Sequence, residues 1–167
     1  MNLPDGWLSD NEASELQRLA KGCWVLELGA WKGRSTVALA QVAAFVWSVD
    51  TFHGDANTGK QDTFDEYARN LRLWDVSEKV RTSVGAFADI VPGLDMGSFD
   101  VVFVDGEHSY ASTREALDLT IPRMQVGAMV LVHDYSPALE GVIRAVDERT
   151  DLYPTGRCES LWTGVRC

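Results

Sequence analysis

Polar residues that could bind a ligand or move a proton stand directly after four apolar runs of this chain. These residues are Glu27, Asp50, Asp105, and His133 with Asp134. If the runs are parallel β-strands, these side chains meet at the carboxyl edge of one sheet, where open α/β sheets bind their ligands. Carboxylates there can accept hydrogen bonds. Glycines beside two of them, Gly29 and Gly106, let the backbone come close to a ligand.

His108 follows Asp105 by three residues and is the candidate proton acceptor. The ordinary pKa of histidine lies near neutrality, so His108 could take the proton of a hydroxyl as a general base. A structural, hydrogen-bonded role is the alternative for a single loop histidine. Asp105 and Asp134 are the other two candidate catalytic residues.

The segment from Val25 to Ser35, Val-Leu-Glu-Leu-Gly-Ala-Trp-Lys-Gly-Arg-Ser, predicts a strand, a tight turn and the start of a helix. Such a turn holds nucleotide-like ligands on parallel sheets. A phosphate-binding P-loop needs four residues between its glycines and then a lysine. Here three residues separate Gly29 from Gly33, and Arg34 stands in place of the lysine. A dinucleotide fingerprint also fails, because Trp31 occupies its second glycine position. A purely structural strand–helix turn is the remaining alternative.

The acid-x-Gly-x-x-x-Gly pattern of this turn resembles motif I of class I S-adenosylmethionine (SAM) methyltransferases. Three more segments extend the resemblance: Val49-Asp-Thr-Phe-His-Gly-Asp55, Phe99-Asp-Val-Val-Phe-Val-Asp-Gly-Glu-His-Ser-Tyr110 and Gly127-Ala-Met-Val-Leu-Val-His-Asp-Tyr135. Together they resemble small bacterial methyltransferases with Asp-Gly-x-His-Ser-Tyr and His-Asp-Tyr after strands four and five. The resemblance runs from about Gly6 to the C-terminus. It implies a SAM-binding methyltransferase fold and does not define a substrate.

The predicted cofactor site combines the glycine turn with two later positions. Asp50 stands about twenty residues after the turn, where a carboxylate can take both ribose hydroxyls. The resemblance implies the same role, and a helix or turn cap is the alternative. Phe87 should lie near the adenine, where it could stack on the base or pack in the core. The predicted set is Glu27, Gly29, Ala30, Trp31, Gly33, Ser35, Asp50, Thr51, Phe52, Gly85, Ala86, Phe87, Asp105 and Gly106. Trp31 is the one tryptophan of six expected to touch ligand, and the others are assigned mainly to the core.

The resemblance also implies a metal. In metal-dependent O-methyltransferases the acids after strands four and five hold Mg²⁺, so Asp105 and Asp134 are the predicted ligands. Carboxylate oxygens suit this hard cation, which would lower the pKa of the substrate hydroxyl. Relatives usually carry a second acid or amide beside the counterpart of Asp134, whereas this chain has His133, a poor Mg²⁺ ligand. That departure favours His108 over the metal, and both remain competing predictions. Asp105 and Asp134 would shape the pocket for the methyl acceptor in either case.

Charge and composition exclude several classes of function. The 167 residues include 25 acids and 15 bases, which gives a net charge of −10. Without a cluster of Lys and Arg, a nucleic-acid partner is not expected. The sequence has neither a run of about 18 apolar residues nor a signal peptide, so we expect a cytoplasmic protein that does not enter the membrane. The cysteines, Cys23, Cys158 and Cys167, are expected to be plain thiols.

Apolar periodicity predicts alternating strands and helices in a single domain spanning residues 1–167. The strands are expected at 23–28, 43–49, 80–84, 100–104 and 128–132, and a hairpin at 152–167. The helices are expected from the Ser9–Glu12 capping box to about residue 20, at 35–44, 61–74 and 110–121, and after a Ser136-Pro137 N-cap. This order predicts the α/β class: a Rossmann-like, doubly wound, mostly parallel sheet with a C-terminal antiparallel hairpin and helices on both faces.

The sequence as a whole predicts a SAM-dependent methyltransferase that methylates a hydroxyl of a small molecule or sugar. Its expected cofactors are SAM and, in the metal alternative, Mg²⁺. Two other functions stay open: a SAM-binding domain without methyl-transfer activity of its own, and a nicotinamide-dependent oxidoreductase. A homodimer is also left open.

Overall fold

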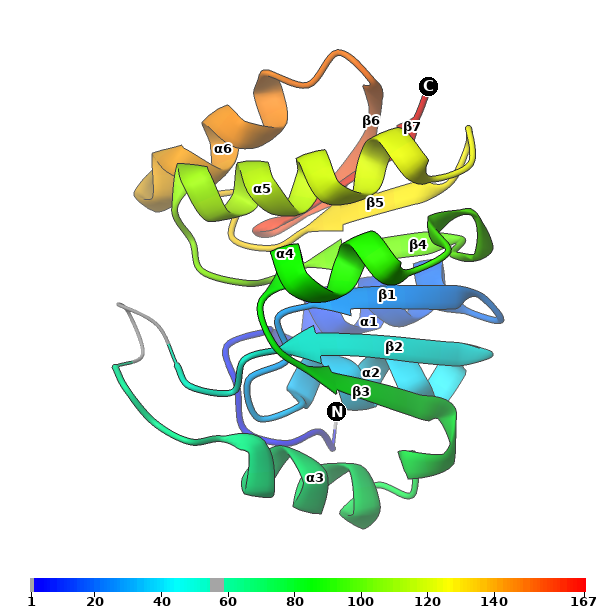
Figure 1. The fold of residues 1–167 in the computed structure, drawn as a ribbon, viewed down its shortest axis with the longest axis vertical. Coiled ribbons are helices and arrows are strands. Elements are labelled where there is room, and N and C mark those ends of the chain that lie inside the picture. The colour runs from blue at the N-terminus through cyan, green and yellow to red at the C-terminus, as the bar shows by residue number, and fades with distance from the viewer. Residues whose placement is uncertain (1, 55–58) are drawn as a thin grey trace.

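The computed structural model describes residues 2–54 and 59–167 and is built on one seven-stranded sheet. Its strands are β1 (Trp24–Leu28), β2 (Phe45–Asp50), β3 (Val80–Val84), β4 (Val101–Val104), β5 (Met129–Val132), β6 (Leu152–Cys158) and β7 (Leu161–Arg166). The strand order is β3-β2-β1-β4-β5-β7-β6, in which β1 to β5 run parallel and β7 is antiparallel to both of its neighbours (Figure 1). The predicted mostly parallel sheet and C-terminal hairpin are therefore confirmed. Asp55, the last residue of one quoted motif, lies outside the described residues.

Helices cover both faces of the sheet, as predicted. They are α1 (Asp10–Ala20), α2 (Arg34–Val42), α3 (Phe64–Leu73), α4 (Phe87–Ile90), α5 (Tyr110–Thr120) and α6 (Glu140–Asp147). Short 3₁₀ turns lie at Ser77–Lys79, Val91–Gly93, Met96–Ser98, Ile121–Arg123 and Pro137–Leu139. In Figure 1, α4, α5 and α6 lie in front of the sheet, and α1 and α2 lie behind it.

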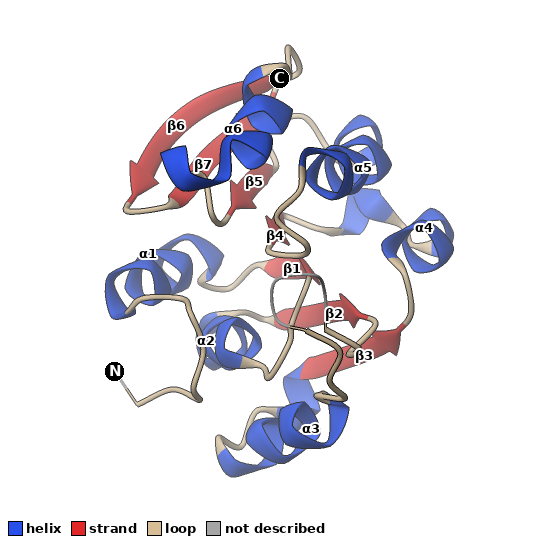
Figure 2. Cartoon of the chain, turned by 90° about the vertical axis from the view of Figure 1, so that its left-hand side faces the viewer, coloured by secondary structure: helices blue, strands red, loops and turns tan. Residues whose placement is uncertain are grey.

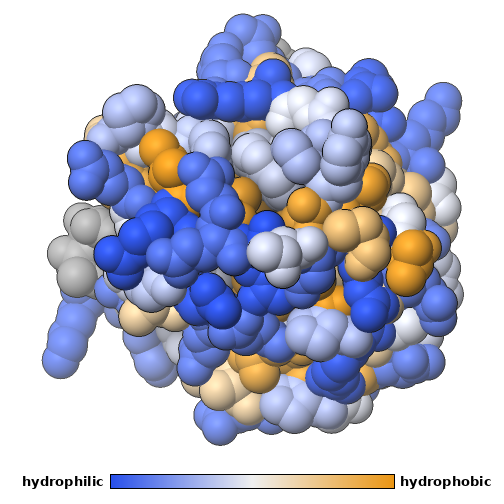
Figure 3. Space-filling view, turned by 90° about the horizontal axis from the view of Figure 1, so that it is seen from above, coloured by the Kyte–Doolittle hydropathy of each residue, from blue (hydrophilic) through white to orange (hydrophobic). Residues whose placement is uncertain are grey.

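The parallel strands are buried on both faces, which explains their continuous apolar sequences. Along β4, Val101 and Phe103 pack into the core beneath α1 and α2, whereas Val102 and Val104 pack into the core beneath α5 and α6. Successive side chains of a strand point to opposite faces, so one run of four apolar residues supplies both cores. β6, at the edge of the sheet, is mostly exposed. The surface at the α6 and β6 end of the molecule, seen from above in Figure 3, is mostly hydrophilic, and its apolar side chains lie in small groups.

Several predicted boundaries need correction. α2 ends at Val42, two residues before the predicted end, because Ala43 is extended. α3 begins at Phe64 rather than at residue 61. Ser136 does not cap α6: a 3₁₀ turn follows it, its side chain makes no capping bond, and α6 begins at Glu140. The four-residue helix α4 was not predicted.

The capping box at the start of α1 is present as predicted. The Ser9 hydroxyl accepts a hydrogen bond from the backbone N–H of Glu12 at 3.1 Å, and the Glu12 carboxylate accepts one from the backbone N–H of Ser9 at 3.0 Å.

Within the described part of the chain, none of the helices is long and apolar enough to cross a lipid bilayer.

Candidate functional site

A cavity of about 500 Å³ opens at the carboxyl ends of the parallel strands. Figure 2 looks onto this edge of the sheet, and the loops that follow the strands lie toward the viewer. Twelve predicted site residues line the cavity: Gly29, Ala30, Trp31, Ser35, Asp50, Thr51, Ala86, Phe87, Asp105, Gly106, His108 and Asp134. The structure therefore brings the glycine turn, the end of β2 and the predicted catalytic groups around one space.

Four predicted residues do not line that cavity: Glu27, Gly33, Phe52 and Gly85. Phe52 is 1% exposed and packs its ring against Phe64 and Tyr67. The Glu27 carboxylate is fully buried and accepts hydrogen bonds from the hydroxyls of Ser35 and Thr36, each at 2.6 Å. It thereby holds the first turn of α2 against β1. Burial raises the pKa of Glu27 to about 7 even though these hydrogen bonds favour the charged form.

The two glycines of the turn are required by the protein's own backbone. Gly29 has a φ of 98°, and a Cβ there would stand 2.1 Å from the carbonyl oxygen of Asp105. Gly33 has a φ of 88° at the N-cap of α2, and a Cβ there would meet the ring of Tyr67 at 3.0 Å. The glycines thus let the turn pack against β4 and α3, a reason that does not involve a ligand.

The Asp50 carboxylate organises the glycine turn. Its Oδ2 accepts the backbone N–H groups of Ala30 at 2.6 Å and Trp31 at 2.8 Å. Its Oδ1 accepts the N–H of Phe52 at 2.7 Å. Trp31 and Phe52 both have positive φ values, 45° and 59°, which non-glycine residues adopt rarely. Asp50 therefore ties together two backbone segments of unusual conformation, the glycine turn and the loop after β2.

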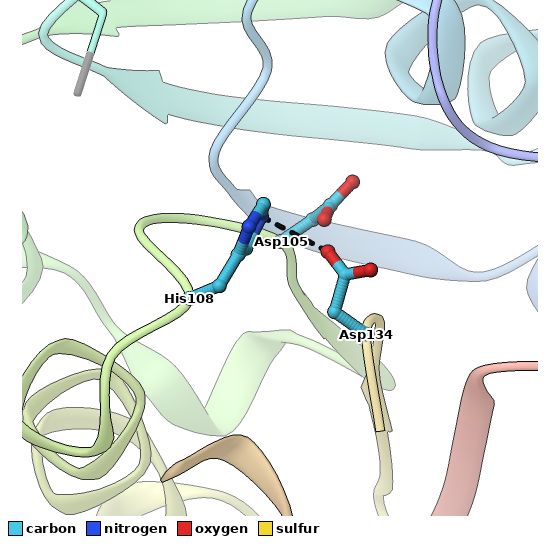
Figure 4. A group of neighbouring side chains, drawn as sticks. All are labelled: Asp105, His108 and Asp134. Atoms are coloured by element: carbon cyan, nitrogen blue, oxygen red, sulfur yellow. Dashed lines mark ion pairs between the residues drawn. The ribbon is translucent and has the colours of Figure 1, made fainter. Parts of the chain in front are cut away.

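The predicted catalytic residues form one cluster at the ends of β4 and β5 (Figure 4). His108 Nε2 lies 2.9 Å from Asp134 Oδ2, and one ligand atom from each of Asp105, His108 and Asp134 lies within 4.8 Å of the others. Burial opposes ionisation of Asp134, but hydrogen bonds from His108 and His133 hold the pKa of this carboxyl below its ordinary value. The cluster can accept a proton through His108, or surround a divalent cation.

His133 is a buried cation beneath this cluster. Its Nδ1 lies 3.0 Å from Asp105 Oδ1 and 3.3 Å from Asp134 Oδ2, and its Nε2 lies 3.2 Å from Glu12 Oε2. A carboxylate can only accept, so a ring that donates to carboxylates from both nitrogens carries two protons and a positive charge. Burial favours the neutral ring, but the charge of Asp105 and the hydrogen bonds to the acids raise the pKa of His133 well above its ordinary value.

Sequence reasoning missed several residues in or beside the cavity, and Glu12 and Trp7 show why. Glu12 is 3% exposed, and beyond the capping box and His133 its Oε1 accepts the backbone N–H of Ser160 at 2.9 Å and the Ser160 hydroxyl at 2.6 Å. The capping-box pattern predicted a role for Glu12 only at the N-terminus of α1. Trp7 was assigned to the core, yet it is 65% exposed, lines the cavity and stacks on Trp31 with ring centroids 4.5 Å apart.

Arg34 explains why Trp7 lies at the surface. The guanidinium donates to the backbone carbonyls of Pro4 at 2.7 Å and Leu8 at 2.6 Å, and it pairs with Asp10. These bonds hold the segment before α1 across the start of α2. Arg34 is thus used structurally at the position where a P-loop has its lysine.

Most of the charged residues that line the cavity are carboxylates. Asp50, Asp105, Glu107, Glu115 and Asp134 all border it, whereas Arg34 is paired with Asp10 and His133 with three acids. This charge favours a cationic or neutral ligand over an anionic one.

A family model described as a methyltransferase domain matches residues 26–135. Among curated proteins, the chain is 28% identical over 142 residues to 8-demethyl-8-(2,3-dimethoxy-alpha-L-rhamnosyl)-tetracenomycin-C 4'-O-methyltransferase of Streptomyces olivaceus, covering 67% of this chain and 52% of that protein. It is 26% identical over 137 residues to demethyldecarbamoylnovobiocin O-methyltransferase of Streptomyces niveus, covering 66% and 52%. The chain therefore spans about half the length of these curated relatives.

Among solved structures, the fold is similar to that of the O-methyltransferase TomG from Streptomyces achromogenes, whose crystal structure is a complex with SAM. The TM-score is 0.72 at 22% sequence identity, and the similarity covers 99% of this chain and 83% of TomG.

Proposed function

Because the chain belongs to the family of SAM-dependent methyltransferase domains, we propose that it transfers a methyl group from SAM to a hydroxyl of a small molecule or sugar. The curated relatives support the choice of oxygen, since both are named O-methyltransferases. One is named for methylation at the 4′-oxygen of a compound that carries a rhamnosyl group, which supports a sugar hydroxyl among the candidate acceptors.

The observation that carries the proposal is the cavity that joins Asp50 to the His108 cluster. About 500 Å³ lies within the range of small-molecule sites, and the space borders both predicted subsites. Its acidic lining suits the positively charged sulfonium of SAM. Asp50, the glycine turn and the segment around Phe87 would hold the nucleoside, and Asp105 and Gly106 would border its reactive end.

Bound SAM would supply a methyl group made electrophilic by the sulfonium. The protein's part is then to align the acceptor and to remove its proton. His108 would take the proton at its ring nitrogen, and Asp134, 2.9 Å from Nε2, would orient the ring and stabilise the charge it gains. Asp105, held at 3.0 Å by His133, would fix the wall beside the acceptor.

The competing hypothesis is that the same cluster binds a divalent cation. Two carboxylates and one imidazole within 4.8 Å form a donor set that fits a divalent cation in number and type. The cation would lower the pKa of the acceptor hydroxyl. Against it, His133 already lies within 3.3 Å of oxygens of both Asp105 and Asp134, and its positive charge opposes a second cation.

A binding and turnover experiment tests the proposal. SAM and its demethylated product, S-adenosylhomocysteine (SAH), should raise the melting temperature, and NAD should not. A panel of hydroxylated aglycones and sugars should then be incubated with methyl-labelled SAM and searched for labelled product. Binding of SAH without turnover on any compound would favour a SAM-binding domain without its own activity. Stabilisation by NAD rather than SAH would contradict the proposal.

A further inference from the structure

The hydrogen-bonding capacity of Asp50 is nearly used up by the protein. A carboxylate has about four lone-pair positions. Oδ2 already accepts two N–H groups, from Ala30 and Trp31, and Oδ1 accepts one, from Phe52. One position on Oδ1 remains. Asp50 can therefore accept one ribose hydroxyl, and the second hydroxyl of the diol needs another partner.

Thr63 offers a hydroxyl in the wall of the same cavity. The residue is 1% exposed and lines the cavity, and its Oγ1 has no hydrogen-bond partner among residues 2–54 and 59–167. A buried hydroxyl without a partner is destabilising, and native proteins rarely leave one unsatisfied. Because Thr63 borders the cavity, a polar group of a bound ligand can supply the missing partner.

The position of Thr63 directly before α3 makes its unused hydroxyl unusual. Thr63 is the N-cap of α3, where a threonine side chain ordinarily accepts an N–H of the first helical turn. It makes no such bond, and the carboxylate of Asp62 accepts the N–H of Phe64 instead, at 3.2 Å.

The backbone fixes Thr63 next to Asp50. The N–H of Thr63 donates to the carbonyl of Phe52 at 3.0 Å, while the N–H of Phe52 donates to Asp50 at 2.7 Å. The carbonyl of Thr63 accepts the N–H of Tyr67 at 2.9 Å. Asp50 and Thr63 are thus joined through a single residue and border the same space.

We propose that Thr63 binds the second hydroxyl of the ribose diol, next to the hydroxyl that Asp50 accepts. The inference rests on the proposed function, because the diol belongs to SAM. It adds a residue outside the glycine turn and the strand ends to the nucleoside site.

Calorimetric titration with SAH tests this without an acceptor substrate. Thr63→Val removes the hydroxyl and keeps the shape, so it should weaken SAH binding roughly threefold to tenfold, the fold-change of one neutral hydrogen bond. Thr63→Ser should bind like the wild type. The melting temperature of the ligand-free Thr63→Val protein should stay the same or rise, because an unsatisfied buried hydroxyl is lost. Thr120→Val is the matched control: it removes a buried threonine hydroxyl from α5, away from the cavity, and should leave SAH affinity unchanged.

Two SAH analogues, lacking the 2′- or the 3′-hydroxyl, locate the contact. The analogue that lacks the hydroxyl contacted by Thr63 should bind the wild type and Thr63→Val equally. The other analogue should still bind Thr63→Val more weakly than the wild type. Equal SAH affinity of Thr63→Val and wild type would overturn the inference. So would an equal loss with both analogues, or a lower melting temperature of the ligand-free variant, which would indicate a structural role. If the wild type itself does not bind SAH, the proposed function fails instead.

Discussion

At the scale of single residues, Asp50 connects the shape of the glycine turn to the predicted ribose site. The sequence correctly predicted that Asp50 ends β2 beside the turn. It could not predict the three backbone N–H groups that converge on the carboxylate, because two of them come from a turn about twenty residues earlier. The expectation that Asp50 would take both ribose hydroxyls did not count these bonds.

Asp50→Ala should weaken SAH binding by roughly tenfold or more, the effect of losing a charge-assisted hydrogen bond of about 1.5–3 kcal/mol. It should also lower the melting temperature, since three backbone N–H groups lose their acceptor. Calorimetry and thermal melts measure the two effects. Thr51→Val, on the next residue, is the control: it removes only the acceptor of one long hydrogen bond, from the N–H of His53 at 3.4 Å, and should lower the melting temperature much less. Wild-type affinity for SAH in a folded Asp50→Ala protein would contradict the ribose assignment.

The choice between His108 and a metal is also decided at single residues. If His108 is the base, His108→Ala should reduce the rate with an identified acceptor by roughly 10²–10⁴-fold and flatten the acidic limb of the pH–rate profile. EDTA should then have no effect.

If a cation is required, EDTA should abolish turnover, and Mg²⁺ or Mn²⁺ should restore it. Asp134→Asn should then remove most activity while SAH affinity stays nearly intact. Turnover that resists the chelator would exclude the metal, and full activity of His108→Ala would exclude the base.

At the scale of elements, prediction succeeded where local sequence determines structure. β3 occupies Val80–Val84 as predicted, and the capping box of α1 lies where the Ser9–Glu12 pattern places it. Apart from α4, the errors fall at element ends. Ser136-Pro137 has the residues of a helix start, but a 3₁₀ turn intervenes before α6. The short helix α4 is not detectable because four residues contain barely one turn of periodicity.

The glycine turn gives a prediction at this scale. Gly29→Ala should destabilise the protein much more than Gly127→Ala, as measured by urea denaturation. Both glycines have positive φ, 98° and 88°, so both changes impose backbone strain of about 1–3 kcal/mol. A Cβ at Gly127 meets nothing within 4 Å, whereas at Gly29 it collides with the Asp105 carbonyl at 2.1 Å. Equal losses for the two variants would mean that the turn can move away from β4.

At the scale of the whole molecule, the fold class was predictable but the complete cavity was not. Alternating apolar runs are enough to infer a parallel sheet and its carboxyl edge. Trp7 and Glu12 reach the site through contacts far apart in sequence, such as the bonds from Arg34 to Pro4 and from Ser160 to Glu12. Such contacts leave no periodic signal. Trp7 was therefore assigned to the core, and Glu12 to a cap alone.

Global stability should depend on pH through Glu27. Its pKa is about 7 when folded, compared with an ordinary value of 4.5, so the unfolded chain loses its proton first. Protonated Glu27 therefore makes its full contribution to the free energy of unfolding below pH 4.5. As the pH rises to about 7, the free energy of unfolding falls by roughly 3 kcal/mol because this contribution is lost. Urea denaturation across this range should show the wild type losing stability relative to Glu27→Gln, which cannot titrate. Parallel pH profiles of the two proteins would contradict the raised pKa.

The bond between Glu12 and Ser160 has a consequence for how the protein is made. Their positions are 148 residues apart, and Ser160 lies between β6 and β7, which follow every candidate catalytic residue in the sequence. A growing chain therefore carries Asp105, His108 and Asp134 before the hairpin that completes the surroundings of Glu12 and His133. Closing so long a loop is slow relative to local folding. The hydrogen bonds from Ser160 to Glu12 can therefore form only after Asp105, His108 and Asp134 have been synthesised, so this support beneath His133 is added to strand ends that are already in place.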